Sequence, residues 1–212
     1  MIVRDMMTTD LVTVGPDDTI WHAIGLFRQY QFHHLPVVQE GHRSHRVQDS
    51  SQKPENIFLG FVTTQTIELA AARAEQDAVE NVSSHSWQER HVTEIMHHPQ
   101  VWVMPTTSVA TAAQLLVERG MNCLPVIETE QSNSGSRMLL VGLLTRSDIL
   151  LMLARALGAF EASTQVSIQL SSGQMKPLAR ALLIADELNI PIRSLLAVLH
   201  EQTSQSISLH LS

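Results

Sequence analysis

The sequence predicts an α+β fold made of two copies of one unit, followed by a smaller β-α-β-β appendage. Three observations predict it. The chain matches itself at an offset of 89 residues, each copy carries a helical stripe followed by two β-type runs, and the pattern changes past Glu161. With 212 residues, 44% of them hydrophobic, the chain can bury a sizeable core. Because one copy alone would expose an apolar sheet face, pairing two copies is the expected way to cover it.

The two copies agree without a gap from residues 3–36 to residues 92–125. In each copy, apolar side chains recur at i, i+3, i+4 and i+7, which predicts a helix with one buried face. The stripe residues are Ile20, Ala23, Ile24 and Phe27 in the first copy, and Val109, Ala112, Ala113 and Leu116 in the second. A polar cluster precedes each stripe and can accept hydrogen bonds from the first helical N–H groups. These clusters are Asp17-Asp18-Thr19 and Thr106-Thr107-Ser108.

Two short β-type runs follow each helix. The first run opens with Leu-Pro-Val, at Leu35–Val38 and at Leu124–Ile127. The second run ends in a threonine, Thr63 or Thr145, where the offset falls to 82 because the first copy has the longer loop. That loop, residues 39–56, is rich in Ser, Gln, His and Arg and predicts mobile surface. A further helix follows each threonine, so each copy reads strand, helix, strand, strand, helix.

Composition excludes several classes of protein. Basic residues number 14 and acidic residues 21, a net charge of −7, whereas general binding to nucleic acid needs a surplus of Lys and Arg. The single cysteine, Cys123, excludes an internal disulfide and a Cys-rich zinc site, and is typical of a reducing compartment. No apolar run approaches the roughly 18 residues that span a bilayer. We therefore expect a cytoplasmic protein that binds neither nucleic acid nor a membrane.

These motifs, in this order and twice over, resemble a tandem pair of CBS domains, the Bateman module. The resemblance covers residues 1–157, and it implies repeats at 1–75 and 92–157, a linker at 76–91, and a separate unit at 162–212. The matching openings are Val3-Arg4-Asp5-Met6-Met7 and Val92-Thr93-Glu94-Ile95-Met96. The matching middle and closing motifs are His34-Leu35-Pro36-Val37, Cys123-Leu124-Pro125-Val126 and Gly142-Leu143-Leu144-Thr145-Arg146-Ser147-Asp148.

The resemblance implies a non-catalytic sensor that binds an adenine nucleotide or adenosyl ligand in a cleft between the repeats. In the family, the closing Gly-hydrophobic-hydrophobic-Thr/Ser-x-x-Asp motif supplies the polar end of a site. Carried over to this sequence, Thr145 and Ser147 would donate hydroxyls to phosphate or ribose. Asp148 would accept hydrogen bonds from the ribose diol, and Arg146 would bind phosphate. The wall around adenine would come from the first repeat, at Val12, Phe32, His33 and Pro36.

The first repeat departs from the closing motif, because Thr66 stands where the family has aspartate. A single hydroxyl cannot replace a carboxylate that accepts two hydrogen bonds. We therefore expect a degenerate second cleft that binds weakly or not at all. Its residues would be Thr63, Thr66, Val101, Met121 and Asn122.

The C-terminal residues predict a strand, a helix and two more strands. The segments are Gln165–Leu170, Leu178–Leu188, Leu195–Leu199 and Ile207–Leu211. This order, with Gly173, Leu178 and Asn189-Ile190 in their places, resembles the first part of an ACT domain, which would suggest an amino-acid ligand. A full ACT unit would continue, so either the unit is shortened or another subunit covers the missing surface. A CBS pair with such a tail is similar to the AcuB-type regulatory proteins of acetoin utilisation.

Several alternatives remain open at this point. The ligand would be AMP, ATP or S-adenosylmethionine, and a homodimer and a regulated protein partner are expected by resemblance. A scaffolding protein with empty clefts is the main alternative, and an enzyme that uses His33 or His97 is another. Adjacent histidines on an extended segment point to opposite faces, so neither His33-His34 nor His97-His98 predicts a metal site. We expect no cofactor and no catalytic residue.

Overall fold

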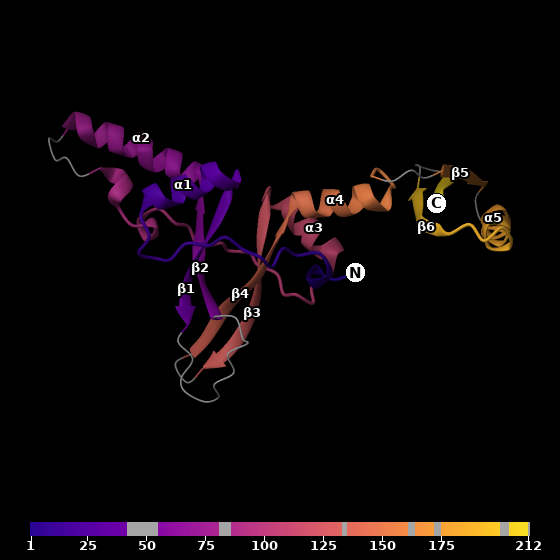
Figure 1. The fold of residues 1–212 in the computed structure, drawn as a ribbon, viewed down its shortest axis with the longest axis horizontal. Coiled ribbons are helices and arrows are strands. Elements are labelled where there is room, and N and C mark those ends of the chain that lie inside the picture. Colours follow the sequence, from indigo (N-terminus) through magenta and orange to yellow (C-terminus); the bar gives the residue numbers. More distant parts are fainter. Residues whose placement is uncertain are drawn as a thin grey trace. The chain divides into compact units, whose positions relative to one another are not determined.

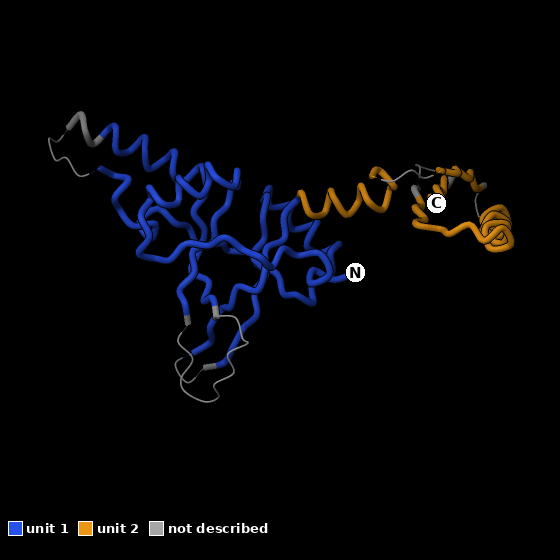
Figure 2. Tube along the Cα trace, viewed as in Figure 1, with its two compact units in different colours: residues 1–146 blue, residues 147–212 orange. Residues whose placement is uncertain are grey.

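A computed structural model describes most of the chain, and it divides into two compact units, residues 1–146 and residues 147–212 (Figure 2). Each unit is described by itself. None of the described helices is both long and apolar enough to cross a membrane. The described ranges are residues 1–41, 55–80, 86–132, 135–160, 164–171, 175–199 and 204–211.

A four-stranded antiparallel sheet joins the two repeats in the first unit (Figure 1). β1 (His34–Gly41) pairs with β2 (Glu55–Thr63), and β3 (Cys123–Ser132) pairs with β4 (Gly135–Thr145). The two hairpins meet where β2 lies beside β4, which gives the strand order β1-β2-β4-β3. Both hairpins shift register at the same repeat position, so the repeat extends to the irregularities of the strands.

The predicted helices form where the stripes place them. α1 (Ile20–Tyr30) and α3 (Val109–Glu118) begin after Thr19 and Ser108, whose side chains accept hydrogen bonds from backbone N–H groups in the first helical turn. α2 (Thr64–Glu80) and α4 (Arg146–Ala156) follow β2 and β4. Three short 3₁₀ helices complete the unit. They are η1 (Val3–Asp5), η2 (Trp87–Glu89) and η3 (Val92–Glu94).

The first strand expected in each repeat is reduced to one parallel bridge residue. Val14 pairs with Val37 in the first repeat. The next residue that would donate to the same neighbour is Pro16, which has no N–H, so the ladder stops. The second repeat stops in the same way, with Val103 as the bridge residue and Pro105 two residues later.

Two boundaries differ from the sequence prediction. α2 continues to Glu80, so residues 76–80 of the expected linker are helical, and residues 81–85 lie outside the described residues. The ends of the expected loop at 39–56 are strand, because β1 reaches Gly41 and β2 begins at Glu55, while residues 42–54 are not described. Helix α4 has no buried residue, and the division of the chain falls at its first turn.

The first unit packs around two apolar clusters. The first combines α1, β1 and β2 of repeat one with Val92 from the opening of repeat two. The second cluster joins both hairpins and includes Cys123, which is 3% exposed and therefore a buried small side chain. Residues from both repeats thus share each cluster. The buried members of the second cluster are Val38, Phe58, Phe61, Cys123, Ile127 and Leu140.

The second unit confirms the predicted β-α-β-β order. Beyond α4 it contains β5 (Thr164–Ser171), α5 (Lys176–Glu187), β6 (Ile192–Leu199) and β7 (Ser204–Leu211). The three strands form an antiparallel sheet of order β5-β7-β6. Leu170 and Leu209 of the sheet pack with Leu178 of α5. The resemblance to an ACT domain stays a prediction, and Gly173 lies outside the described residues.

Candidate functional site

The opening segment of each repeat is bound by the other repeat. The Val3 N–H donates to the Thr107 carbonyl at 2.8 Å, and the Val92 N–H donates to the Asp18 carbonyl at 2.9 Å. These two bonds correspond to each other under the repeat offset. Both valines are fully buried. The relative position of the two repeats is therefore fixed by backbone hydrogen bonds made in both directions.

Reciprocal backbone hydrogen bonds between the two repeats also form at the sheet. Thr8 and Leu143 form two reciprocal backbone hydrogen bonds of 2.9 Å, and His97 and Phe61 form the corresponding pair at 2.9 Å. A strand of one repeat is thus paired with the opening of the other. Phe61 and Leu143 belong to the closing motifs, so the strand part of each motif lies at the junction of the two repeats.

The glycines of the closing motifs make this pairing possible. A Cβ added at Gly60 would lie 2.6 Å from the His97 carbonyl oxygen, and one added at Gly142 would lie 3.0 Å from the Thr8 carbonyl oxygen. Both distances are shorter than an ordinary carbon–oxygen contact. The glycine of the motif is required here because another backbone passes directly across the strand.

The closing motif of the first repeat is occupied by its own hydrogen bonds. The Thr66 hydroxyl accepts from the Thr63 N–H at 3.0 Å and donates to the Thr63 carbonyl at 2.9 Å. In return, the Thr63 hydroxyl accepts from the Thr66 N–H at 3.1 Å. The two threonines therefore cap the start of α2. This arrangement supports the expectation of a degenerate second cleft, because the one hydroxyl at the aspartate position is already used.

The role of the other residues predicted for that cleft stays a prediction. Val101 and Met121 are half-buried, and Asn122 is exposed. The Asn122 carbonyl accepts from the Arg146 N–H at 3.1 Å, which ties the turn before β3 to the start of α4.

The closing motif of the second repeat straddles the end of β4 and the start of α4. Thr145 is half-buried and lies opposite Cys123 in the sheet. The Arg146 guanidinium, predicted to bind phosphate, donates one hydrogen bond to the Leu116 carbonyl in α3 at 2.9 Å. Ser147 and Asp148 follow in the first turn of α4, where a carboxylate is favoured by the helix dipole.

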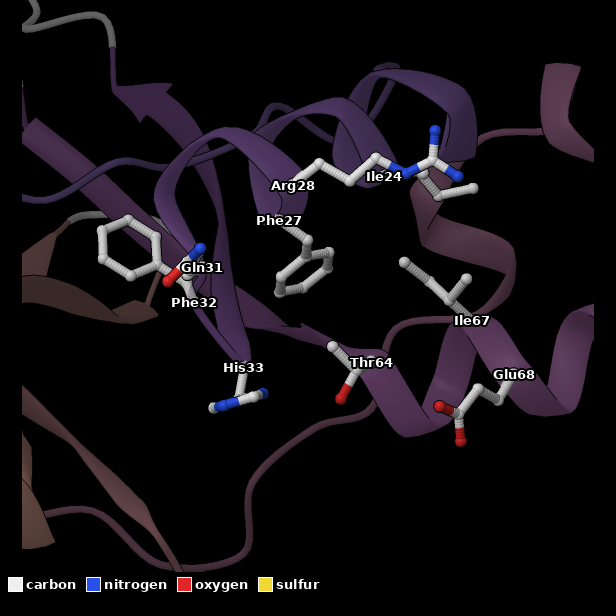
Figure 3. A pocket seen from close by; sticks show the side chains of 9 residues that line it. All are labelled: Ile24, Phe27, Arg28, Gln31, Phe32, His33, Thr64, Ile67 and Glu68. Atoms are coloured by element: carbon white, nitrogen blue, oxygen red, sulfur yellow. The ribbon is translucent and has the colours of Figure 1, made fainter.

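Two of the four residues predicted to surround adenine line a cavity. Phe32 and His33 border a hollow of about 550 Å³ beside α1 and α2 (Figure 3). Phe32 is 41% exposed and stacks on Tyr30, with ring centroids 5.4 Å apart. Val12 instead packs on the first apolar cluster, and Pro36 is buried in β1, where its carbonyl accepts from the Val14 N–H. The structure thus does not bring these last two side chains to the cavity.

The sequence prediction missed most of the cavity lining. Ile24, Phe27 and Ile67 form its apolar part, and the polar groups come from both helices and the turn after α1. A signal was present in the sequence. Four of the lining residues share the i, i+3, i+4, i+7 spacing of one helix face. They are Ile24, Phe27, Arg28 and Gln31, and the remaining polar lining residues are His33, Thr64 and Glu68.

Histidines gather at the junction next to this cavity. The rings of His34 and His97 both lie near the ring of Phe61, with centroid distances of 6.0 and 6.1 Å. Burial, followed by the neighbouring His97 and His33, lowers the pKa of His34. Burial, followed by His98, lowers the pKa of His97, and the Phe61 carbonyl opposes that shift. Within the described part of the chain, no three His, Cys, Asp or Glu side chains are arranged to hold a metal ion.

Comparison with known proteins identifies the repeat. The CBS-domain family matches residues 3–45 and 92–155. The CBS domain-containing protein YhcV of Bacillus subtilis is 26% identical over 167 residues, which cover 79% of this chain and 96% of YhcV.

Solved structures share the fold. AcuB from Vibrio cholerae aligns with a TM-score of 0.53 at 22% identity, covering 74% of this chain and 93% of AcuB. CBSX2, solved in complex with AMP, aligns with a TM-score of 0.51 at 21% identity, covering 73% of this chain and 96% of CBSX2. The pairing of two repeats predicted from the sequence is therefore confirmed as a known architecture.

Proposed function

Because this chain belongs to the CBS-domain family, we propose that it is a non-catalytic regulatory module that binds an adenine nucleotide or another adenosyl compound. The observation that carries the proposal is the cavity of about 550 Å³ at Phe32 and His33, the two residues at which the family resemblance implies a wall around adenine. A cavity of this size is within the range of small-molecule sites. The fold relative CBSX2 was solved with AMP, which agrees with this ligand class.

The polar contacts of the ligand are part of the proposal. Thr145, Ser147 and Asp148 do not line the cavity at Phe32 and His33. By the family resemblance, Asp148 would accept hydrogen bonds from the ribose diol of a ligand bound at the closing motif of the second repeat, and Thr145 and Ser147 would donate to its ribose or phosphate. The Thr63–Thr66 pair offers no carboxylate, and the Thr66 hydroxyl is held by its own helix start. One working site and one degenerate site are therefore expected per chain.

Occupancy would be relayed through the exchanged openings. A ligand that binds one arrangement of the two repeats better than another shifts the population toward that arrangement. Backbone bonds such as Val3 to Thr107 and Val92 to Asp18 tie each opening to the opposite repeat. A shift at the site is therefore carried to both openings, where a dimer partner or a regulated protein would sense it.

Thermal melting of the purified chain tests the proposal. Ligands are AMP, ADP, ATP, S-adenosylmethionine and an unrelated nucleotide, each on wild type, Asp148→Ala and Phe32→Ala. A ligand at a hundredfold excess over its Kd stabilises the native state by about 2.7 kcal/mol, which raises the midpoint by roughly 5–10 °C for a chain of this size. A rise with an adenosyl ligand that both substitutions reduce is expected. No rise with any of them would overturn the proposal.

A scaffolding role is the second candidate, and helix α4 favours it. Leu150, Leu151 and Leu153 of this helix are 63%, 42% and 42% exposed. Apolar side chains clustered on one exposed helix are typical of a surface that associates, so we expect a homodimer that buries them. Sedimentation of wild type and Leu150→Glu, with and without AMP, separates the two roles. A dimer that Leu150→Glu dissociates, in a protein that binds no adenosyl ligand, would favour scaffolding alone.

A further inference from the structure

We propose that the cavity of the first repeat selects a phosphorylated ligand, and that Arg28 binds its phosphate. This inference rests on the proposed function and names the ligand class within it. It separates AMP and ATP from uncharged adenosine and from cationic adenosyl compounds such as S-adenosylmethionine. The residues that line the cavity differ from those at the corresponding positions of the second repeat.

The cavity is open because the first repeat lacks an arginine. In the second repeat, the Arg146 guanidinium reaches the Leu116 carbonyl at the end of α3. The corresponding residues of the first repeat are Thr64 and Phe27, and both line the cavity. Since threonine has a short side chain, the space beside the Phe27 carbonyl that a guanidinium would fill is left to the cavity. The cavity thus lies in the repeat that has threonine at the position of Arg146.

The Arg28 guanidinium and the His33 imidazole of the cavity have no equivalents in the second repeat. Arg28 and His33 line the cavity, and their counterparts in the second repeat are Val117 and Asn122. Arg28 extends along one side of the cavity, beyond Phe27, with His33 on the opposite side (Figure 3). A cavity with the Arg28 guanidinium on one side and the His33 imidazole on the other is suited to an anion that bears an aromatic or apolar group.

Arg28 is available to a ligand. Its guanidinium makes no hydrogen bond or ion pair with any residue in the described part of the chain. A guanidinium stays charged at every physiological pH and binds phosphate through two parallel N–H groups. Helix α1 holds the residue on the same face as Ile24 and Phe27, the apolar side of the cavity. Phosphate and an apolar ring can therefore be bound together.

Glu68 limits the positive potential of the cavity. Its carboxylate also lies on the lining, and it makes no hydrogen bond or ion pair with a described residue. The corresponding residue of the second repeat is Leu150. Because like charges repel, Glu68 opposes the phosphate that Arg28 attracts. Removing this carboxylate should therefore tighten binding of a phosphorylated ligand, and removing the guanidinium should weaken it.

Isothermal titration calorimetry of the full chain with adenosine, AMP, ATP and S-adenosylmethionine tests the inference. The variants are Arg28→Gln and Glu68→Gln, with Arg137→Gln as a control, since Arg137 is half-buried on β4 and does not line the cavity. Wild type should bind AMP at least about tenfold more tightly than adenosine. Arg28→Gln should weaken AMP about tenfold and leave adenosine unchanged, since a charge-assisted hydrogen bond is lost from the phosphate alone. Glu68→Gln should tighten AMP, and Arg137→Gln should change neither ligand.

Other outcomes distinguish the two proposals. If adenosine or S-adenosylmethionine binds as tightly as AMP, the inference is wrong and the proposed function stands. Equal weakening of AMP and adenosine by Arg28→Gln also overturns it, because the residue then acts through packing. If no adenosyl compound binds to wild type, the proposed function fails and the inference fails with it.

Discussion

Replacing Gly60 with alanine should destabilise the first unit by about 2–4 kcal/mol. The added Cβ would lie 2.6 Å from the His97 carbonyl oxygen, a backbone atom that cannot rotate away. To restore an ordinary contact of 3.4 Å, the crossing segment must retreat by about 0.8 Å. That movement acts directly on the hydrogen bonds between the two repeats.

The magnitude follows from two contributions. The Phe61 N–H donates to the His97 carbonyl and the His97 N–H donates to the Phe61 carbonyl, both at 2.9 Å. Complete loss of either hydrogen bond would cost about 1 kcal/mol of stability. Inserting a carbon into a packed contact adds roughly 1–3 kcal/mol of strain. If the crossing segment moves away, the strain falls while the two hydrogen bonds weaken further. The total cost therefore stays at about 2–4 kcal/mol.

Urea unfolding followed by tryptophan fluorescence measures the effect, since Trp21, Trp87 and Trp102 all lie in the first unit. Gly142→Ala should cost less, because its nearest contact, at 2.8 Å, is the flexible Met7 thioether.

Gly25→Ala is the matched control. It lies in α1 with no atom within 4 Å of its added Cβ, so it should stabilise by about 0.5–1 kcal/mol. A Gly60→Ala protein as stable as Gly25→Ala would refute the close approach of the two repeats.

Three further changes test other parts of the fold. The stability of the first unit should fall as pH drops from about 6.5 through the lowered pKa values of His34 and His97, because folding favours their neutral rings. Urea midpoints between pH 8 and pH 5 measure this; His97→Thr should flatten the profile, and a slope equal to that of the wild type would contradict the assignment. Gln31→Gly should raise the free energy of unfolding by about 1 kcal/mol, since the φ of 55° at this position suits glycine. A lower melting temperature in the variant would show that the glutamine side chain stabilises the turn. His210 is 4% exposed, with both ring nitrogens unpartnered among the described residues, so His210→Leu should stabilise the second unit by about 1–3 kcal/mol. Hydrogen exchange along β7 checks this, and faster exchange in the variant would contradict it.

The elements that local spacing encodes were predictable from the sequence. The stripe from Ile20 to Phe27 and the caps Thr19 and Ser108 place α1 and α3. The repeat then extends each assignment to the other half of the chain. The reduction of the first strand to one bridge residue could also have been predicted, because Pro16 stands at the next ladder position and has no N–H.

Contacts between distant segments were not predictable in the same way. The pairing of Thr8 with Leu143 and of His97 with Phe61 leaves no periodic pattern, and only the glycines at positions 60 and 142 mark it. Arg28 was missed for a different reason. The family motifs identify only the motif positions, and Arg28 is not one of them. It lines the cavity because of its position on one face of a helix.

The exchanged openings imply that neither half of the chain is self-sufficient. Residues 1–8 supply a strip that belongs spatially to the second repeat, and residues 91–97 supply one that belongs to the first. Two fragments divided between residues 81 and 85 would each carry the piece that completes the other, so they should fold on mixing and not alone. The same arrangement allows two intact chains to exchange their opening segments by domain swapping. The hydrogen bonds that an opening segment makes within one molecule can equally be made with a second copy. The length of the connection between the halves would then decide whether the protein closes on itself or interlocks with a neighbour.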